Sequence, residues 1–493
     1  MPHSQIVVPD NDRPLHEALA ALQTEFELPA GFSPEVSAEL ERSIAEHRLP
    51  DSDLTGLPFI TIDPPASMDL DQAMHLVREG QGYRVYYAIA DVPGFVPPGG
   101  ALDAETRKRG QTIYAPDRIT PLHPKQLSED AASLLAGKTR SAFVWQLALD
   151  SAGNTVGATV ARAQVASVAK LGYAQAQDEL DAGTQSEYLP TLELLKEIGL
   201  KRIELERRRG GASLNSPQQE VVHEAGAYQL VFRPNLPIED WNAQISLATG
   251  MAAAQIMLEG KIGILRTMPA PDPAAVDRFR RQAAALGKPW PRDLAYGEFL
   301  RSLDPAEPRQ LALLHAATAL FRGAGYTPFD GEVPEQTSQA AVAAPYAHTT
   351  APLRRLVDRF VLTICAALSN GAEVPDWARA ALPDLPKLMA ASDQLAGRVD
   401  RAALDTVEAA VLSSRIGEEF DAVVLAGARK TDNKAEPGKG APRPSTQFST
   451  VQLTEPAVSA PCEGDLEPGS TLRVRLLTAD IATRTVRFTV AAD

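Results

Sequence analysis

Residues 59–71 combine a short apolar run with a turn that the chain cannot avoid. Phe59, Ile60, Thr61 and Ile62 favour a β-strand that ends at Asp63, because apolar and β-branched side chains follow one another there. Two prolines follow at positions 64 and 65. Consecutive prolines fit neither a helix interior nor a central strand, so the stretch predicts a strand that ends in a turn and passes into an acidic loop.

Three aspartates, Asp63, Asp69 and Asp71, lie within nine residues of this stretch. An extended backbone would place Asp69 and Asp71 on one face, because they are two residues apart. Crowded carboxylates repel one another unless a cation lies between them, and Mg²⁺ prefers such oxygen ligands together with water and phosphate. Two such ions about 4 Å apart can hold the attacking and leaving oxygens of a phosphodiester. Taken alone, the stretch also fits an acidic surface loop, so both interpretations stay open.

The stretch resembles the signature of the RNB-type exoribonucleases, the family of ribonuclease II and ribonuclease R. Asp63, Asp69 and Asp71 occupy the first three aspartate positions of that signature, and Gln72 stands at the fourth. Further blocks similar to the family's follow in the same order: residues 87–92, 98–103, 109–110, 112–118, 122–134, 207–212 and 346–358. Together they cover about residues 55–365.

The resemblance implies a hydrolytic 3′→5′ exoribonuclease that degrades RNA processively to nucleoside 5′-monophosphates. It implies one or two Mg²⁺ ions, for which Mn²⁺ can substitute, held by Asp63, Asp69 and Asp71 with help from Gln72. Asp71 would be the critical carboxylate, and Arg354 would stabilise charge on the phosphate at the scissile bond. The residues that the resemblance places against RNA are Tyr114, which would pack on the 3′-terminal nucleotides, and Arg118, Arg109, Thr350, Pro352 and Arg355.

Gln72 departs from the family pattern, whose fourth aspartate helps to hold the metal. A glutamine carbonyl is a neutral oxygen ligand, so the substitution predicts weaker metal affinity or a different site geometry. Asn242 and Ala243 likewise replace glutamates that in the family contact the terminal nucleotide. These departures support an alternative hypothesis, an RNA-binding protein with a degenerate RNB site. A third hypothesis, which sets the resemblance aside, is a metal-dependent hydrolase of a small phosphoester.

The chain as a whole predicts a multidomain α+β protein. Residues 1–52 are expected to form a small helical module, either helix-turn-helix-like or simply packed on the rest, in which Leu15, Leu19 and Leu22 mark one helix face. Residues 53–375 are expected to form the catalytic domain of mixed sheet and helices, and residues 376–415 a helical segment that closes it. Short β-branched runs over residues 416–493 resemble an S1-like OB-fold, a β-barrel that binds RNA.

Composition limits the partners and the compartment. A net charge of −15 argues against nonspecific coating of nucleic acid but allows a single strand to enter a locally basic channel. Basic clusters at residues 107–109, 207–209 and 354–355 are candidates to line it. Only two cysteines occur, no apolar run reaches about 18 residues, and no signal peptide pattern opens the chain. We therefore expect a cytoplasmic monomer that binds single-stranded RNA and no membrane.

Overall fold

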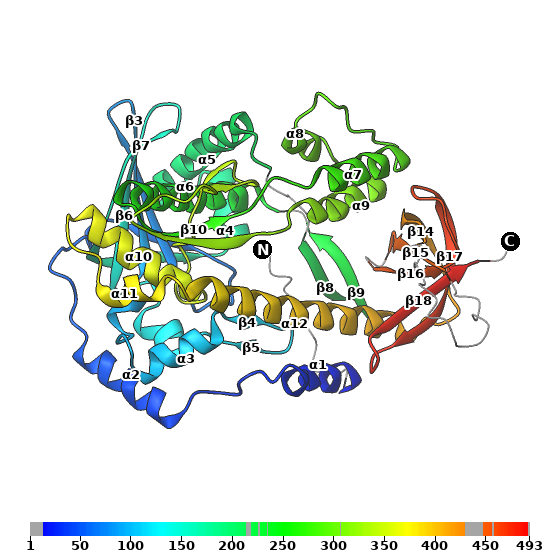
Figure 1. Ribbon diagram of the computed structural model, residues 1–493, viewed down its shortest axis with the longest axis horizontal. Helices are drawn as coiled ribbons and strands as arrows, with labels where there is room; N and C mark the ends of the chain where they lie inside the picture. The colour runs from blue at the N-terminus through cyan, green and yellow to red at the C-terminus, as the bar shows by residue number, and fades with distance from the viewer. Residues whose placement is uncertain are drawn as a thin grey trace.

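The computed structural model describes residues 13–212, 218–224, 227–233, 235–305, 307–428, 447–455 and 458–491. Two β-barrels stand at opposite ends of the molecule, and the long helix α12 (Leu385–Ser413) runs from one toward the other (Figure 1). The predicted α+β fold with a C-terminal barrel is confirmed. No helix within these described ranges is sufficiently long and apolar to cross a membrane.

The larger barrel carries the acidic loop. Its strands close in the order β1-β2-β3-β6-β7. As predicted, β1 ends just before Asp63; it pairs antiparallel with β2, where Ile60 faces Met74, and parallel with β7, where Ile62 faces Leu171. The acidic loop therefore begins beside the end of β7. The strands are β1 (Phe59–Ile62), β2 (Gln72–Glu79), β3 (Gly82–Ala90), β6 (Thr139–Leu149) and β7 (Thr155–Leu171).

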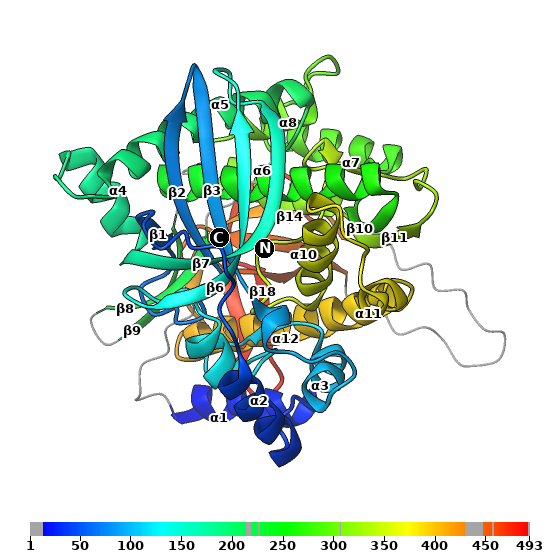
Figure 2. The same ribbon diagram turned by 90° about the vertical axis from the view of Figure 1, so that its left-hand side faces the viewer.

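Helices cover this barrel and share its core. Figure 2 shows α5 and α6 behind the long upright strands β2, β3, β6 and β7. Buried alanines let α6 lie close to its neighbours, and an added Cβ at Gly250 would stand 2.2 Å from the ring of Tyr346. This close contact seats the start of the 346–358 block on α6. The helices that share the core are α4 (Tyr173–Ala182), α5 (Leu189–Arg209), α6 (Pro237–Gly260), α10 (Leu356–Ser369), α11 (Asp376–Ala381) and α12.

The two N-terminal helices, α1 (Arg13–Glu25) and α2 (Pro34–Glu46), pack on the rest of the chain. Leu15, Leu19 and Leu22 of α1 belong to one buried cluster with α12 and the C-terminal barrel. Both carboxylate oxygens of Glu39 in α2 accept backbone N–H bonds of 2.9 Å at the start of α3 (Ala101–Arg109). Of the two predicted roles for this module, packing on the rest is the one that these contacts support.

A group of short helices lies between the two barrels. Phe279, Trp290 and Phe299 form its aromatic core, and Gln282 Nε2 donates a 2.9 Å bond to the Leu425 carbonyl in the C-terminal barrel. This bond and the cluster of α1 fix the C-terminal barrel from two sides. The group consists of α7 (Pro273–Ala285), α8 (Tyr296–Arg301), α9 (Pro308–Ala317) and the 3₁₀ turn η3 (Thr318–Leu320).

The C-terminal barrel closes in the order β14-β15-β16-β18-β17, the strand order of an OB-fold. Four strands coincide with the predicted β-branched runs: β14 (Glu419–Ala426), β15 (Phe448–Leu453), β17 (Thr471–Asp480) and β18 (Thr485–Val490). The fifth, β16 (Ser459–Glu463), was not predicted, because Pro461 interrupts a run with no β-branched residue.

Short elements complete the described structure. They are η1 (Val92–Gly94), β4 (Ile113–Tyr114), β5 (Ile119–Thr120), the π-helical turn η2 (Leu127–Ala131), β8 (Gln218–Glu224), β9 (Ala227–Arg233), β10 (Ile262–Thr267), β11 (Gly325–Asp330), β12 (Ser338–Gln339) and β13 (Ala344–Pro345).

Candidate active site

The acidic loop between β1 and β2 is held by backbone bonds at both ends. The N–H of Asp63 donates to the Leu171 carbonyl over 3.1 Å, and the N–H of Ser67 closes the predicted turn on Pro64 over 3.0 Å. At the other end, the Asp71 carbonyl accepts a 2.9 Å bond from the N–H of Ala90. The three aspartates are therefore carried by a fixed loop and not by a mobile surface segment.

Asp71 is the most enclosed of the three aspartates, with 4% of its surface exposed. Its Oδ1 accepts a 2.7 Å bond from the N–H of Leu353, and its Oδ2 lies 3.5 Å from Nε of Arg354. Asp69 accepts a 3.3 Å bond from the hydroxyl of Tyr114. Residues more than 280 positions apart in the sequence thus meet at one place, and Tyr114 and Arg354 lie where they were predicted, beside the carboxylates.

The carboxylates share an environment that disfavours their charge. Burial raises the pKa of Asp63 to about 7, although the charge of Arg354 opposes the rise. Burial also raises the pKa of Asp69, and it raises that of Asp71 well above its ordinary value. The charge of Arg354 is the largest influence that lowers the pKa of Asp63 and of Asp71. One guanidinium therefore partly offsets the desolvation of both carboxyls. A divalent cation would supply the missing positive charge.

The donor chemistry fits Mg²⁺, because the site offers hard carboxylate oxygens and neither thiolates nor imidazoles. Among the described residues, however, no three His, Cys, Asp or Glu side chains already stand as a ready-made ion-binding group. Both oxygens of Asp71 face cationic or N–H partners. Arg354 therefore supplies at Asp71 part of the positive charge that a cation would supply.

The turn that carries Arg354 is anchored residue by residue. The Thr350 carbonyl accepts a 2.5 Å bond from Nε2 of Gln72, and the Pro352 carbonyl lies 3.2 Å from Nε2 of His123. The Arg354 carbonyl accepts a 2.9 Å bond from the N–H of Thr112. Thr350 and Pro352 therefore lie at the site, as predicted, with their backbone groups held by protein.

Two predicted RNA contacts are placed differently by the structure. Arg109 has 7% of its surface exposed, because its guanidinium bonds to the Glu105 carboxylate and to the Gly31 and Pro121 carbonyls. Arg355 forms a bidentate pair of 2.5 and 2.7 Å with Asp358. In this arrangement both guanidiniums are engaged by partners within the protein, and their predicted contact with RNA stays a prediction.

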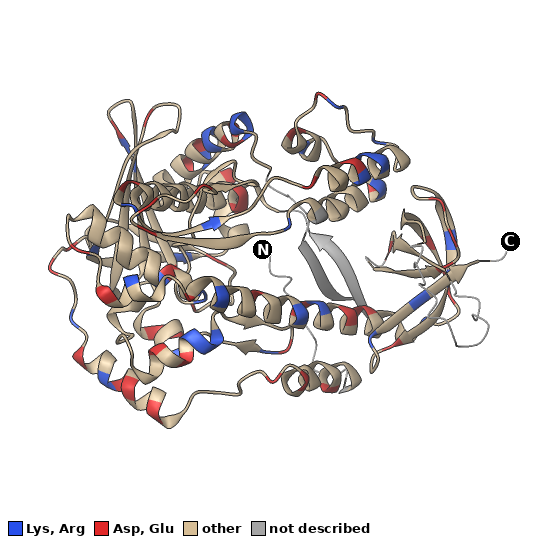
Figure 3. Cartoon of the chain, in the orientation of Figure 1, with Lys and Arg blue, Asp and Glu red and all other residues tan. Residues whose placement is uncertain are grey.

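Among the other predicted basic residues, one is exposed and others form ion pairs. Arg118 is exposed just before β5, so it remains accessible to a ligand. In the predicted cluster at 207–209, Arg207 pairs with Glu204 and Glu298, and Arg208 pairs with Glu204. Figure 3 shows acidic and basic residues alternating along α12, whereas basic residues gather on α7. The arginines of α7 were not predicted to contact RNA, because they lie outside the resembling blocks.

A second layer of polar residues surrounds the site. The hydroxyl of Tyr87 donates a 3.0 Å bond to Oε1 of Gln72 and lies 2.8 Å from the hydroxyl of Ser246. Asn242 Nδ2 donates a 3.5 Å bond to the hydroxyl of Tyr173. Sequence reasoning missed Tyr87 as a site residue, although it opens one of the resembling blocks, because a tyrosine in a strand is most often core.

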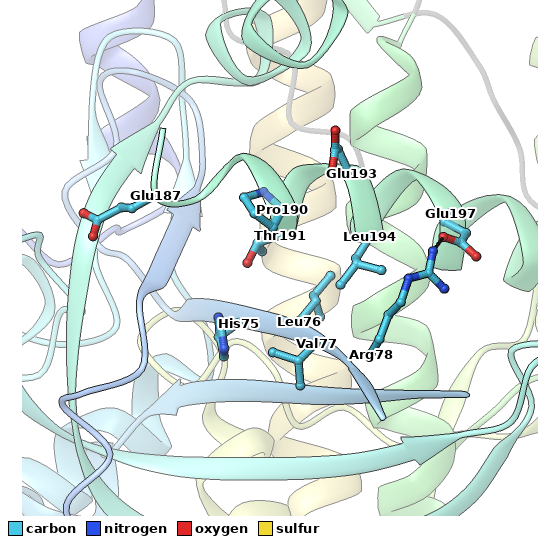
Figure 4. A pocket seen from close by; sticks show the side chains of 10 residues that line it. All are labelled: His75, Leu76, Val77, Arg78, Glu187, Pro190, Thr191, Glu193, Leu194 and Glu197. Atoms are coloured by element: carbon cyan, nitrogen blue, oxygen red, sulfur yellow. Dashed lines mark hydrogen bonds and ion pairs between the residues drawn. The ribbon is translucent and has the colours of Figure 1, made fainter. Parts of the chain in front are cut away.

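A cavity of about 420 Å³ lies apart from the carboxylates, between β2 and α5. Figure 4 shows its lining, where Leu76, Val77 and Leu194 meet the ion pair of Arg78 with Glu197. None of the three site aspartates lines it. The cavity is therefore not the place where the predicted reaction would occur.

Comparison with known proteins gives the chain two matches to family models. Residues 51–370 match the RNB domain, and residues 418–491 match the RNase II-type exonuclease C-terminal S1 domain. The Arabidopsis thaliana protein "Exosome complex exonuclease RRP44 homolog A" is 28% identical over 409 residues, which cover 78% of this chain but 41% of that protein. The chain thus spans about two fifths of the length of this relative.

Solved structures share the fold. The apo form of Mycoplasma genitalium RNase R superposes with a TM-score of 0.82 at 18% identity and covers 98% of this chain and 78% of that one. Yeast Ssd1, described as a pseudonuclease, superposes with a TM-score of 0.64 at 16% identity and covers 94% and 56%. At these identities the likeness concerns the fold alone.

Proposed function

Because the chain belongs to the RNB-domain family, we propose that it is a metal-dependent exoribonuclease that shortens RNA hydrolytically from its 3′ end. The observation that carries the proposal is the meeting of Asp71 with Arg354 and Leu353 from the 346–358 block, beside Asp63, Asp69 and Tyr114. A phosphodiesterase needs acidic metal ligands and a cation for the phosphate at one place, and this arrangement provides both.

Asp63, Asp69 and Asp71 would hold Mg²⁺, or Mn²⁺ in its place. The bound ion would supply a Lewis acid and lower the pKa of a water molecule. The protein's own residues would orient the substrate around it. Burial raises the pKa of all three carboxyls, and ion binding, which requires their charged form, would favour release of any proton that they carry.

Arg354 and Tyr114 would position the RNA. Arg354 lies beside Asp71, and its guanidinium would donate to a phosphate oxygen of the RNA, where negative charge grows during displacement. Tyr114 lies beside Asp69 and can stack on a terminal base, which every base permits because each has a π-face. The contacts of Thr350 and Pro352 with RNA stay predictions.

The C-terminal barrel would bind RNA upstream of the site. It matches an S1 domain, and β17 presents Arg473 and Arg475 at its surface. The arginines of α7 lie between this barrel and the catalytic half (Figure 3). Processive release of nucleoside 5′-monophosphates, a preference for single strands, a monomeric state and a cytoplasmic location stay predictions.

One alternative has a specific observation in its favour. Gln72 stands where the family has an aspartate, and the yeast protein that shares the fold is described as a pseudonuclease. The alternative is an RNA-binding protein with a degenerate RNB site. Against it, Asp63, Asp69, Asp71 and Arg354 are all present and lie together.

The decisive experiment follows 5′-labelled single-stranded RNA in Mg²⁺, in Mn²⁺ and in EDTA. We expect a ladder that shortens from the 3′ end, depends on the divalent ion and disappears in Asp71→Asn. Asp178→Asn, in an exposed position on α4, serves as the matched control and should degrade RNA like the wild type. Tight binding without shortening under either ion would establish the alternative.

A further inference from the structure

Gln72 joins two parts of the site through both atoms of its amide. Its Nε2 donates a 2.5 Å bond to the Thr350 carbonyl, and its Oε1 accepts a 3.0 Å bond from the hydroxyl of Tyr87. The same hydroxyl lies 2.8 Å from that of Ser246 in α6. Gln72, the first residue of β2, thus connects this strand with the turn that carries Arg354.

Hydrogen-bond chemistry fixes the orientation of this amide. A backbone carbonyl can only accept, so the group that faces Thr350 must be the NH₂ of Gln72, and the oxygen must then face Tyr87. An ionised aspartate or glutamate has no donor. An ionised glutamate at this position would bring a carboxylate oxygen against the Thr350 carbonyl and repel it, so an ionised acidic residue cannot make this connection.

The connection supports a turn whose placement sets the geometry of the site. Leu353 bonds to Asp71 through its N–H, and Arg354 faces the same carboxylate. Gln72 is adjacent to Asp71 in the chain, so one strand end holds the turn at two points, Thr350 and Leu353. Without the bond from Gln72 to the Thr350 carbonyl, this strand end would hold the turn only through Leu353.

We propose that Gln72 is a positioning residue, which clamps the Thr350–Arg354 turn onto β2 through its amide and is not a metal ligand. This inference rests on the proposed function. It replaces the predicted metal-binding role of Gln72, because the amide is already committed to the turn and to Tyr87.

The test compares Gln72→Met, Gln72→Glu and the wild type as full chains. Methionine keeps the approximate size of the side chain without either bond, whereas glutamate keeps the acceptor for Tyr87 and adds charge. Gln255→Met, in an exposed position on α6, is the matched control. Affinity for Mn²⁺ without RNA is measured by calorimetry, and degradation of RNA by single-turnover and steady-state kinetics, with Asp63→Asn as the reference for a lost ligand.

For Gln72→Met we expect a Kd for Mn²⁺ within about threefold of the wild type, whereas Asp63→Asn weakens it at least about tenfold. We expect kcat to fall about ten- to hundredfold with little change in KM, because Arg354 acts in the transition state. A tenfold rise in Mn²⁺ should not restore it. In combination with Arg354→Lys the losses should be smaller than their product, because both changes act through one side chain.

Three results would overturn the inference. They are a Kd for Mn²⁺ raised about tenfold in Gln72→Met, activity restored by excess Mn²⁺, or a Gln72→Glu variant that binds the ion more tightly and degrades RNA at least as fast as the wild type. If the wild type itself degrades no RNA, the proposed function fails. The Mn²⁺ affinities of Gln72→Met and Asp63→Asn then decide the inference without reference to activity.

Discussion

Removal of the charge on Asp63 should make the metal-free protein more stable at pH 8. Burial raises the pKa of this carboxyl to about 7 from an ordinary 3.8, so the unfolded chain releases its proton at a lower pH than the folded protein does. Between these values the folded state binds more protons, and stability therefore falls as pH rises. At pH 8 the folded state has lost about 4 kcal/mol through this group, and at pH 5 less than about 2 kcal/mol.

Asparagine at position 63 is neutral at both pH values and avoids this loss. For a unit the size of residues 51–370, unfolding entropy amounts to about 0.7 kcal/mol per degree, so Asp63→Asn in EDTA should unfold about 6 °C above the wild type at pH 8 and about 2 °C above it at pH 5. Asp178→Asn, the exposed control, should leave the midpoint within about 1 °C.

Calorimetry or circular dichroism at both pH values measures these midpoints. Addition of Mg²⁺ at about a hundred times its Kd for the wild type should raise the unfolding free energy of the wild type by about 2.7 kcal/mol. It should raise that of Asp63→Asn, whose affinity is at least about tenfold weaker, by no more than about 1.4 kcal/mol. The reasoning is refuted if Asp63→Asn is less stable than the wild type in EDTA at pH 8. It is equally refuted if the gain is the same at pH 5 and pH 8, because the gain would then not come from the carboxyl proton.

Three further substitutions should distinguish residues that act in the reaction from a residue that stabilises the fold. Asp71→Asn should lower the rate of RNA shortening at least about a thousandfold and change RNA affinity less than about threefold, and a parallel loss of binding would contradict this. Arg354→Lys should lower kcat about a hundredfold in single-turnover assays, because an ammonium lacks the bidentate geometry of a guanidinium, and an unchanged kcat would show that Arg354 does not reach the phosphate. Arg109→Ala should lower the unfolding free energy by about 3 to 5 kcal/mol in urea melts, since it leaves Glu105 and two carbonyls without their partner, and a pure loss of RNA affinity would restore its predicted role.

The sequence predicts the local elements well where a nearby signal fixes them. Ser33 and Pro34 mark the start of α2 through a cap and a preset φ, and Ile62 and Pro64 mark the end of β1. β7, at 17 residues, was not predicted, because its many alanines and single glycine carry little strand signal. Its form is decided by pairing with the preceding strand β6 and with β1, which lies far earlier in the chain.

The site is predictable in its residues and less so in their roles. The resemblance selected Asp63, Asp69, Asp71, Arg354 and Tyr114, which the structure brings together. Arg109 and Arg355 look the same as Arg354 in the sequence, because a guanidinium for RNA and one for a buried carboxylate differ only in their surroundings. Those surroundings form only when the chain folds. For example, the Gly31 carbonyl accepts a hydrogen bond from the guanidinium of Arg109.

The cluster that α1 shares with α12 and the C-terminal barrel has a consequence for biosynthesis. The ion pair of Glu25 with Arg484 joins residues 459 positions apart, so α1 leaves the ribosome long before its partners exist. Until α12 and the barrel emerge, Leu15, Leu19 and Leu22 present an apolar stripe to solvent or to a chaperone. Translation of α12 and of the last strands would then bring these distant segments together, and a nascent chain arrested before residue 385 should leave α1 open to protease.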